Sequence, residues 1–199
     1  MGKLIFYYGV MGCSKSANAL MTKFQYEERG LRVWLIKPSV DNRSDDSTGR
    51  TSTVESRVGI KADATNIFPE DNLLKMLYDY VSPYKKNVII CDEAQFMTPD
   101  QIEQLKDITE LYSIPVLCYG LRTDFKTKLF PGSKRLFELS DEVHELESVC
   151  DCGNHAIVNA RLDSSGNVII HGKQIEIGGD EKYKPLCWKC WKDKQMKEE

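Results

Sequence analysis

The chain has 199 residues, with 27 Lys and Arg against 30 Asp and Glu, so its formal net charge is −3 at neutral pH. This length suits one ordinary domain with at most a small appendage, and the mild acidity argues against a general nucleic-acid binder, which needs clustered Lys and Arg. No apolar run reaches the ~18–20 residues that cross a bilayer, and the N-terminus lacks the pattern of a secretory leader, so we expect a cytoplasmic protein.

Strand and helix signals alternate through the first 148 residues. Short β-prone apolar runs predict strands at 4–8, 33–36, 88–91 and 115–119. Apolar residues at helical spacing predict one helix with Ala17, Leu20, Met21 and Phe24 on one face, and another over 70–81 with Leu73, Leu74, Leu77 and Tyr78 on one face. A further helix should begin at Thr98, where Pro99 and Gln101 complete a capping box. The alternation predicts an α/β fold in which helices cover both faces of a parallel sheet.

Two segments break this alternation. Residues 41–53 have no apolar period and many turn formers, which predicts a mobile loop, with plain disorder as the alternative to a lid. From residue 149 the chain carries closely spaced cysteines and a predicted hairpin, with arms at 156–162 and 168–170. We therefore expect an α/β core over residues 1–148 and a small second unit over residues 149–199.

The segment between the first predicted strand and helix has the features of a phosphate-binding loop. The backbone N–H groups and the positive end of the helix would face an anion, Lys15 can reach the β- and γ-phosphates, and the Ser16 hydroxyl can ligate Mg²⁺. The usual pattern has a second glycine where this chain has Ser14, at a cost of about 1–2 kcal/mol if the backbone there is left-handed. The alternative is a strand-to-helix turn that happens to contain a lysine. The predicted phosphate-binding residues are Gly9, Val10, Met11, Gly12, Cys13, Ser14, Lys15 and Ser16.

Two carboxylates follow the buried strand at 88–91. In an open parallel sheet, ligands bind outside the carboxyl ends of the strands, so Asp92 and Glu93 should face the same crevice as Lys15. Asp92 would hold Mg²⁺ directly or through water, and Glu93 would orient a nucleophile or accept its proton. The alternative is a solvated acidic turn.

These motifs and several later ones occur in an order that resembles the cytosolic-type (type II) thymidine kinases. The resemblance covers nearly the whole chain, and its motifs are specific together although each is weak alone. They are the loop 9–16, Asp92-Glu93-Ala94-Gln95-Phe96, the run from Tyr119 to Phe125, Ile177-Gly178-Gly179 and the cysteine pairs.

The resemblance implies transfer of the γ-phosphoryl group of ATP to the 5′-hydroxyl of thymidine with Mg²⁺, on a RecA-like P-loop core with a zinc-bearing lid, commonly in a tetramer. It implies Glu93 as the catalytic base, and it adds Asp41, Arg43 and Gln95 on the nucleotide side. It assigns the thymine pocket to Met11, Leu121, Phe125, Phe130, the backbone of Gln174, Ile175, Glu176, Ile177 and Gly178, and Tyr183. Core packing is the alternative role for the two phenylalanines. Deoxyuridine should also be accepted, since one methyl group is worth only about 1–3 kcal/mol.

Four of the seven cysteines form two close pairs, Cys150 with Cys152 and Cys187 with Cys190. Such pairs in a reducing compartment indicate a structural Zn²⁺ site, with four reduced thiols in an apolar cluster as the alternative. The family usually has two residues between the first pair, whereas this chain has one. Either the turn is tighter, or His155 replaces a ligand.

Two other functions compete with the kinase. A nucleotide-binding sensor that has lost turnover would explain Ser14, but it would have little use for both Asp92 and Glu93. A zinc-ribbon ATPase acting on nucleic acid is disfavoured by the net charge and by the absence of a basic stripe with interleaved aromatics.

Overall fold

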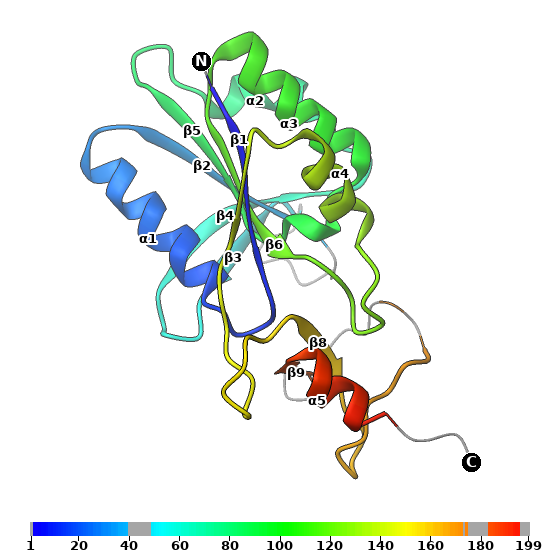
Figure 1. The fold of residues 1–199 in the computed structure, drawn as a ribbon. Helices are drawn as coiled ribbons and strands as arrows, with labels where there is room; N and C mark the ends of the chain where they lie inside the picture. The colour runs from blue at the N-terminus through cyan, green and yellow to red at the C-terminus, as the bar shows by residue number, and fades with distance from the viewer. Residues whose placement is uncertain (1, 40–48, 173, 175–182, 196–199) are drawn as a thin grey trace.

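The computed structural model describes residues 2–39, 49–172, 174 and 183–195, and its larger sheet has seven strands in the order β3-β4-β2-β5-β6-β1-β7. The strands are β1 (Leu4–Gly9), β2 (Arg32–Pro38), β3 (Thr51–Glu55), β4 (Lys61–Ile67), β5 (Asn87–Cys91), β6 (Val116–Leu121) and β7 (Glu142–Glu145). Every neighbouring pair is parallel except β3 and β4. The carboxyl ends of the parallel strands therefore share one edge, which faces the second, smaller sheet in Figure 1.

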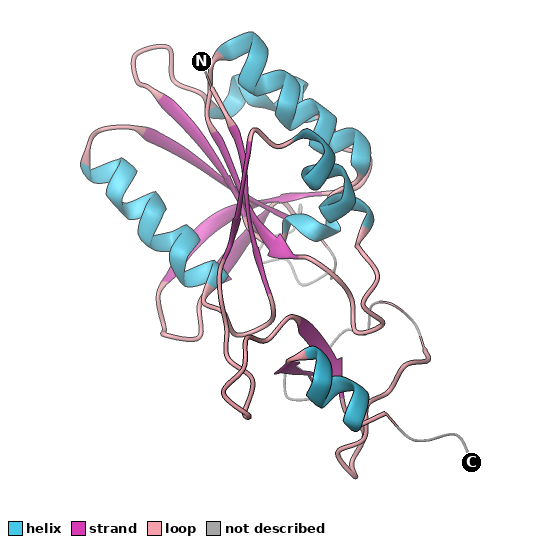
Figure 2. Ribbon diagram, in the orientation of Figure 1, coloured by secondary structure: helices cyan, strands magenta, loops and turns pink. Residues whose placement is uncertain are grey.

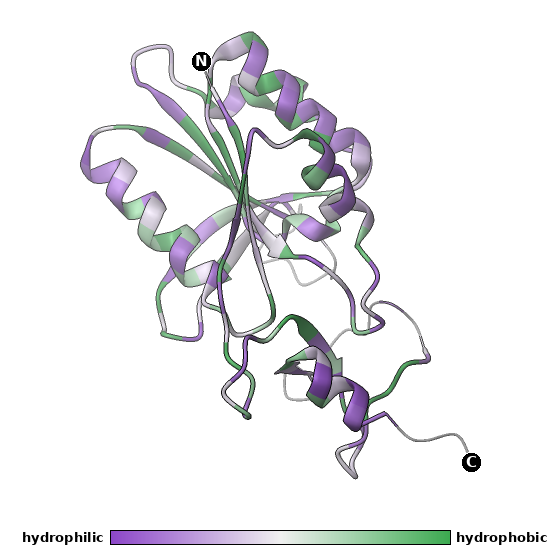
Figure 3. Cartoon of the chain, in the orientation of Figure 1, coloured by the Kyte–Doolittle hydropathy of each residue, from purple (hydrophilic) through white to green (hydrophobic). Residues whose placement is uncertain are grey.

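Helices cover both faces of the larger sheet (Figures 1 and 2). The helix α1 (Lys15–Glu28) lies on one face, and α2 (Leu73–Tyr80), α3 (Pro99–Tyr112) and α4 (Pro131–Leu139) lie on the other. Successive side chains of β5 alternate between the two buried clusters: Ile89 packs with α2, α3 and α4, and Ile90 packs with α1. Figure 3 shows the apolar residues gathered along the central strands. The predicted α/β class with a mostly parallel sheet is confirmed.

The helices α1 and α2 occur where the apolar period predicts them, but their buried faces differ from the prediction. In α1, Met21 and Phe24 are 47% and 63% exposed, and in α2, Tyr78 is 70% exposed. Thr22 instead contacts the sheet, where its hydroxyl lies 3.3 Å from the Tyr119 hydroxyl. The buried residues of α1 are Lys15, Ala17, Ala19 and Leu20. The capping box of Thr98 and Gln101 at the start of α3 is confirmed.

The hairpin of β3 and β4 corrects the prediction that residues 41–53 form a loop throughout. Thr51–Glu55 pairs antiparallel with Lys61–Ile67 and extends the sheet at its edge. The buried side chains of β3 are Ser52 and Val54, so half of its inward face is polar and gives little apolar signal. The helix α4 was also not predicted. Residues 40–48 lie outside the described residues.

The smaller sheet pairs β8 (Val158–Arg161) with β9 (Tyr183–Leu186), and α5 (Trp188–Asp193) follows it. The predicted turn near residue 165 is present, since Gly166 N donates to Asp163 O. The second arm is not a regular strand. Ile169 N donates to Arg161 O at 2.8 Å and a single bridge joins Leu162 to Val168, while Val168 N donates to Lys194 O. None of the helices in the described ranges is both long enough and apolar enough to span a bilayer.

Candidate active site

The loop between β1 and α1 has the backbone of a phosphate cradle at the carboxyl edge of the sheet. Gly12 has φ 79° and Ser14 has φ 63°, both in the left-handed region. Ser14 therefore adopts the conformation that the glycine of the usual pattern would adopt, at a cost of about 1–2 kcal/mol. Lys15 is buried, and its Nζ donates to Val10 O at 2.8 Å and lies 3.6 Å from Cys13 Sγ.

Asp92 immediately follows β5 and is only 4% exposed. Burial raises the pKa of its carboxyl group to about 6 and the neighbouring Glu93 adds to the rise, whereas a hydrogen bond from Ser16 and the charge of Lys15 oppose it. Its Oδ1 is buried with no hydrogen-bond partner among the described residues. The Asp92 carboxylate oxygen and the nearby Ser16 hydroxyl are together suitable ligands for Mg²⁺, which prefers oxygen.

Glu93 is held in place by its backbone and by one amide. Its φ of 54° lies in the left-handed region, which turns the chain sharply from β5 into the short 3₁₀ helix η1 (Ala94–Phe96). The buried Gln95 donates from Nε2 to Glu93 Oε2, and its Oε1 accepts from Leu121 N at 2.9 Å. A Cβ at Gly120 would lie 2.7 Å from Gln95 Oε1, so glycine is required there for Gln95 to reach both partners.

The phosphate loop and Glu93, at the acidic strand end, line one cavity of about 210 Å³. Its wall includes Lys15, Ser16 and Glu93, and Met11 and Leu121 from the predicted nucleoside side. Asp92, which we also expected in this crevice, is not among the residues that line it. The rest of the wall comprises Gly12, Ser14 and Ala17, together with Glu55 at the end of β3 and Ser56, Arg57 and Val58 in the turn that follows. Sequence analysis missed this turn, although a Ser-Arg-Val-Gly run between two β-prone segments could have indicated a hairpin tip.

The other predicted nucleoside contacts are not among the residues that line this cavity. Phe125 is buried beneath the Arg161 guanidinium, whose carbon lies 5.4 Å from the ring centre, and Phe130 packs edge-on against Phe96. Gln174 is exposed, and Tyr183 begins β9. The remaining predicted residues, Asp41, Arg43, Ile175, Glu176, Ile177 and Gly178, lie outside the described residues.

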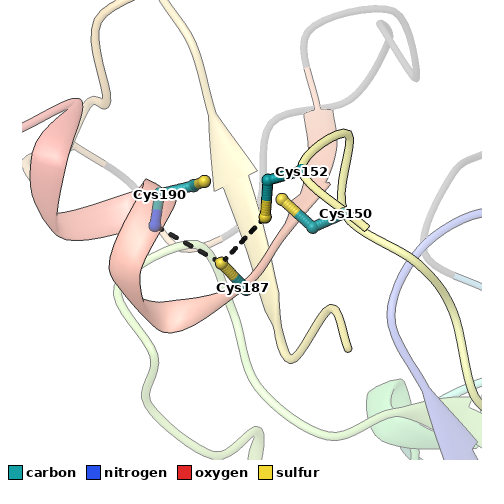
Figure 4. Close-up of side chains that lie close together, drawn as sticks. All are labelled: Cys150, Cys152, Cys187 and Cys190. Carbon is teal, nitrogen blue, oxygen red and sulfur yellow. Dashed lines mark hydrogen bonds between the residues drawn. The ribbon is translucent and has the colours of Figure 1, made fainter. Parts of the chain in front are cut away.

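Figure 4 shows the four paired cysteines directed toward one another. Their sulfur atoms all lie within 4.8 Å of one another, and Cys152 Sγ is 3.6 Å from Cys187 Sγ. Tetrahedral zinc with bonds of ~2.3 Å holds its sulfur ligands about 3.8 Å apart, so the arrangement fits the ion. A hydrogen bond from the Asn154 backbone and the neighbouring thiols lower the pKa of Cys152 to about 6, whereas hydrogen bonds with Cys152 and Cys187 raise the pKa of Cys190 to about 12. Before a metal binds, Cys152 is therefore the thiol of this pair that ionises more readily.

The short spacing between Cys150 and Cys152 is accommodated by a tight turn. Gly153 N donates to Cys150 O at 2.8 Å, and Gly153 has φ 84°, which glycine adopts without strain. His155 is not part of the group, because its Nε2 contacts Glu145 Oε1 at 3.2 Å. Of the two alternatives raised by the spacing, the geometry therefore favours the tighter turn.

A phosphate-binding loop and an acidic strand end at one edge of a parallel sheet define the P-loop class of nucleotide-binding α/β proteins. Comparison with known proteins narrows the class, because the family model for thymidine kinase matches residues 2–191. The chain belongs to the thymidine kinase family.

Individual thymidine kinases are similar in sequence to this protein over almost the whole chain. It is 42% identical over 188 residues to a thymidine kinase of Legionella pneumophila (strain Paris), covering 94% of this chain and 88% of the relative. It is 40% identical over 193 residues to one of Ruegeria pomeroyi, covering 97% and 95%. It is 42% identical over 194 residues to one of Enterobacteria phage T4, covering 97% of each chain.

Proposed function

We propose that this protein transfers the γ-phosphoryl group of ATP to the 5′-hydroxyl of thymidine and releases dTMP and ADP. One observation carries the proposal: Lys15, Ser16 and Glu93 line the same cavity, so an anion-binding loop and a candidate base face one another. The family match and the named relatives support thymidine as the acceptor. They give no support to the sensor or to the nucleic-acid ATPase.

The residues of the site have two tasks, which are nucleotide binding and proton transfer. The loop 9–16 binds the phosphates through backbone N–H groups and Lys15, while Asp41 and Arg43 contribute to the nucleotide side. Glu93 accepts the proton of the 5′-hydroxyl as that oxygen bonds to the γ-phosphorus and the bond to the leaving ADP breaks. Gln95 orients the Glu93 carboxylate through its hydrogen bond. Asp92 and Ser16 would hold Mg²⁺, which neutralises charge on the β- and γ-phosphates when bound.

The nucleoside lies on the other side of the cavity. Met11 and Leu121 form its nearer wall. Phe125, Phe130, the backbone of 174–178 and Tyr183 complete the thymine pocket as the family resemblance implies. Because thymine is flat and weakly hydrated, apolar walls with a few fixed hydrogen bonds are sufficient to select it. Deoxyuridine, which lacks only the methyl group, is a second substrate.

The second unit serves as a lid that Zn²⁺ holds together through Cys150, Cys152, Cys187 and Cys190. Its position at the carboxyl edge of the sheet lets it exclude water, which would otherwise accept the phosphoryl group. The family resemblance also leads us to propose a homotetramer, which the mass of the protein in solution would test.

A nucleoside panel with labelled ATP and Mg²⁺ tests this function. We expect thymidine and deoxyuridine to be phosphorylated, with little transfer to deoxycytidine or purine nucleosides. ATP alone measures hydrolysis, and ATP with DNA measures a motor activity. Rapid hydrolysis that thymidine leaves unchanged and DNA stimulates would favour the ATPase, and ATP binding without any transfer would favour the sensor.

A further inference from the structure

One buried amide from the smaller sheet reaches the phosphate loop. Asn159 lies in β8 and is only 3% exposed. Its Oδ1 accepts a hydrogen bond from Met11 N at 2.7 Å, and its Nδ2 donates to Thr123 O at 2.9 Å. Because one partner is a donor and the other an acceptor, the two contacts fix which way the amide points. The side chain thus joins the loops that follow β1 and β6.

The Met11 N–H belongs to the same peptide group as the Val10 carbonyl. That carbonyl accepts the hydrogen bond from Lys15 Nζ at 2.8 Å. Since a peptide group is planar, its N–H and C=O rotate together, and a rotation that breaks the contact with Asn159 also displaces the acceptor of Lys15. Asn159 therefore fixes the peptide on which the ammonium group of Lys15 is held.

The same peptide is packed against the four-cysteine group. The side chain of Val10 is buried in one cluster with Val158, Leu186, Cys150 and Cys187. Val158 precedes Asn159 in β8 and pairs with Leu186 in β9, and Leu186 directly precedes Cys187. Few contacts thus separate the candidate zinc ligands from the loop that carries Lys15.

We propose that Asn159 is a positioning residue, which holds the Val10–Met11 peptide in the conformation that binds nucleotide. Through this contact, the ATP affinity of the loop depends on whether the second unit holds its metal ion. The proposal rests on the proposed function in one respect, namely that this loop binds ATP. Without Asn159, the Met11 N–H loses its acceptor and the Val10–Met11 peptide is free to rotate. Such a rotation changes the backbone of the phosphate loop and moves the carbonyl that holds Lys15.

Two substitutions separate the two contacts of Asn159. Asn159→Leu keeps the branching of the side chain, with larger methyl groups, and removes both hydrogen bonds, so we expect the Kd for Mg–ATP to rise about tenfold and amide exchange at Met11 to accelerate. Asn159→Asp keeps an acceptor for Met11 N and loses the donor to Thr123 O, so Met11 should remain protected and the Kd should rise less. In both variants the KM for thymidine should change less than the Kd for ATP.

Thr109→Val is the matched control for a general loss of stability. Thr109 is fully buried in α3, and its hydroxyl donates to Lys106 O at 2.7 Å, so the substitution also removes a buried hydrogen bond. We expect a lower Tm with an unchanged Kd for ATP. An Asn159→Leu protein that binds ATP as tightly as the wild type, or a Thr109→Val protein that loses affinity to the same extent, overturns the proposal.

Metal removal tests the link to the four-cysteine group. Wild-type protein stripped by a chelator, then dialysed and returned to Mg²⁺, should resemble Asn159→Leu in Met11 exchange and in Kd. Stripping Asn159→Leu itself should add little, because both changes act through one contact. Full additivity would overturn the link. If wild-type protein binds no ATP, the proposed function fails, whereas Met11 exchange still reports whether Asn159 holds the peptide.

Discussion

The two sheets hold their functional residues in different ways. At the edge of the larger sheet, Ser14 and Glu93 carry side chains on left-handed backbone, with φ 63° and 54°. In the described part of the second unit, the residues with positive φ are glycines, namely Gly153, Gly166 and Gly172. Strained backbone persists only where the surrounding packing over-determines it. The larger sheet supplies such packing through its two buried clusters on either face.

The described part of the second unit has a buried cluster of its own, which includes Val158, Leu186 and Trp191, but only a two-stranded sheet. Its sheet consists of β8 and β9, four residues each, and an isolated two-stranded pair is marginally stable in water. We therefore expect the second unit to depend on glycine at its turns and on the proposed Zn²⁺ at its four cysteines. The comparison teaches that the phosphate loop and the acidic strand end should keep their geometry without nucleotide, whereas the second unit should lose its structure without its metal ion.

Zinc removal should produce the largest difference between the two sheets. We expect close to one zinc per chain in protein purified without chelator, and unfolding of the second unit once the metal is removed. Trp188 and Trp191 flank Cys190 in α5, while Trp34 is buried in β2, so tryptophan fluorescence distinguishes the two regions. A Trp34→Phe variant should report the loss of structure around α5, while far-UV circular dichroism retains most of the helical signal.

Cysteine substitutions sharpen the same test. Cys190→Ser should abolish zinc binding, because a structural site needs all four ligands. Cys13→Ala removes a cysteine outside the group and should leave the zinc content unchanged. A wild-type protein that contains no zinc, or a Cys190→Ser protein that still binds one ion, would contradict the assignment.

Glu93→Gln should have the next largest effect, confined to catalysis. Removing the base should lower turnover by about 10²–10⁴-fold, with ATP binding largely intact, because the amide cannot accept the proton. Glu55→Gln is the matched control, since Glu55 lines the same cavity from the turn between β3 and β4. Its turnover should remain within several-fold of the wild type. Equal losses in both variants would mean that Glu93 acts through the charge of the cavity rather than as a base.

Asp92→Asn should raise stability although it impairs activity. Because burial raises the pKa of this carboxyl group to about 6 in the folded chain, its ionised form disfavours folding above that pH. The rise from the ordinary value of 3.8 corresponds to a penalty on the order of 2–3 kcal/mol at pH 8, or roughly 5–10 °C in Tm. The gain should shrink as the pH falls through 6 and vanish below about 4, where Asp92 is protonated in both states.

Asp124→Asn provides the control for the Asp92 measurement. Asp124 is also buried, but its Oδ1 accepts hydrogen bonds from Lys126 N at 2.8 Å and Lys128 N at 2.9 Å. Its carboxylate is therefore satisfied, and the substitution should not raise Tm at pH 8. Thermal unfolding of both variants in the absence of nucleotide and Mg²⁺, from pH 4 to pH 8, makes the comparison.

The parts of the molecule that could be predicted from sequence are those fixed by local rules. The central strands are apolar runs, and the capping box of α3 depends on Thr98 and Gln101 alone. Asp92 and Glu93 follow a buried strand, so their place at the sheet edge follows from topology. Each of these inferences requires only neighbouring residues and the direction of a strand.

The parts that were missed depend on partners distant in sequence. β3 is a strand because Ser52 and Val54 face a core that other elements supply, and β8 forms its sheet with β9, although Ile169 N also donates to Arg161 O. The contact from Asn159 to Met11 spans 148 residues. No periodicity or motif specifies such pairings, because several alternatives satisfy the same local pattern.

Ser14→Gly should have the smallest effect, and it isolates the strain of the phosphate loop. Glycine relieves about 1–2 kcal/mol of left-handed strain but loses more entropy on folding, so we expect a net gain of about 0.5–1 kcal/mol. Ser113→Gly is the matched control, since Ser113 ends α3 with φ 55° and lies outside the site. If packing alone holds both serines, the two variants should gain equally in Tm. A gain at Ser113 without one at Ser14 would mean that the Ser14 side chain stabilises the loop, and the Kd for ATP of Ser14→Gly should then be weaker than that of the wild type.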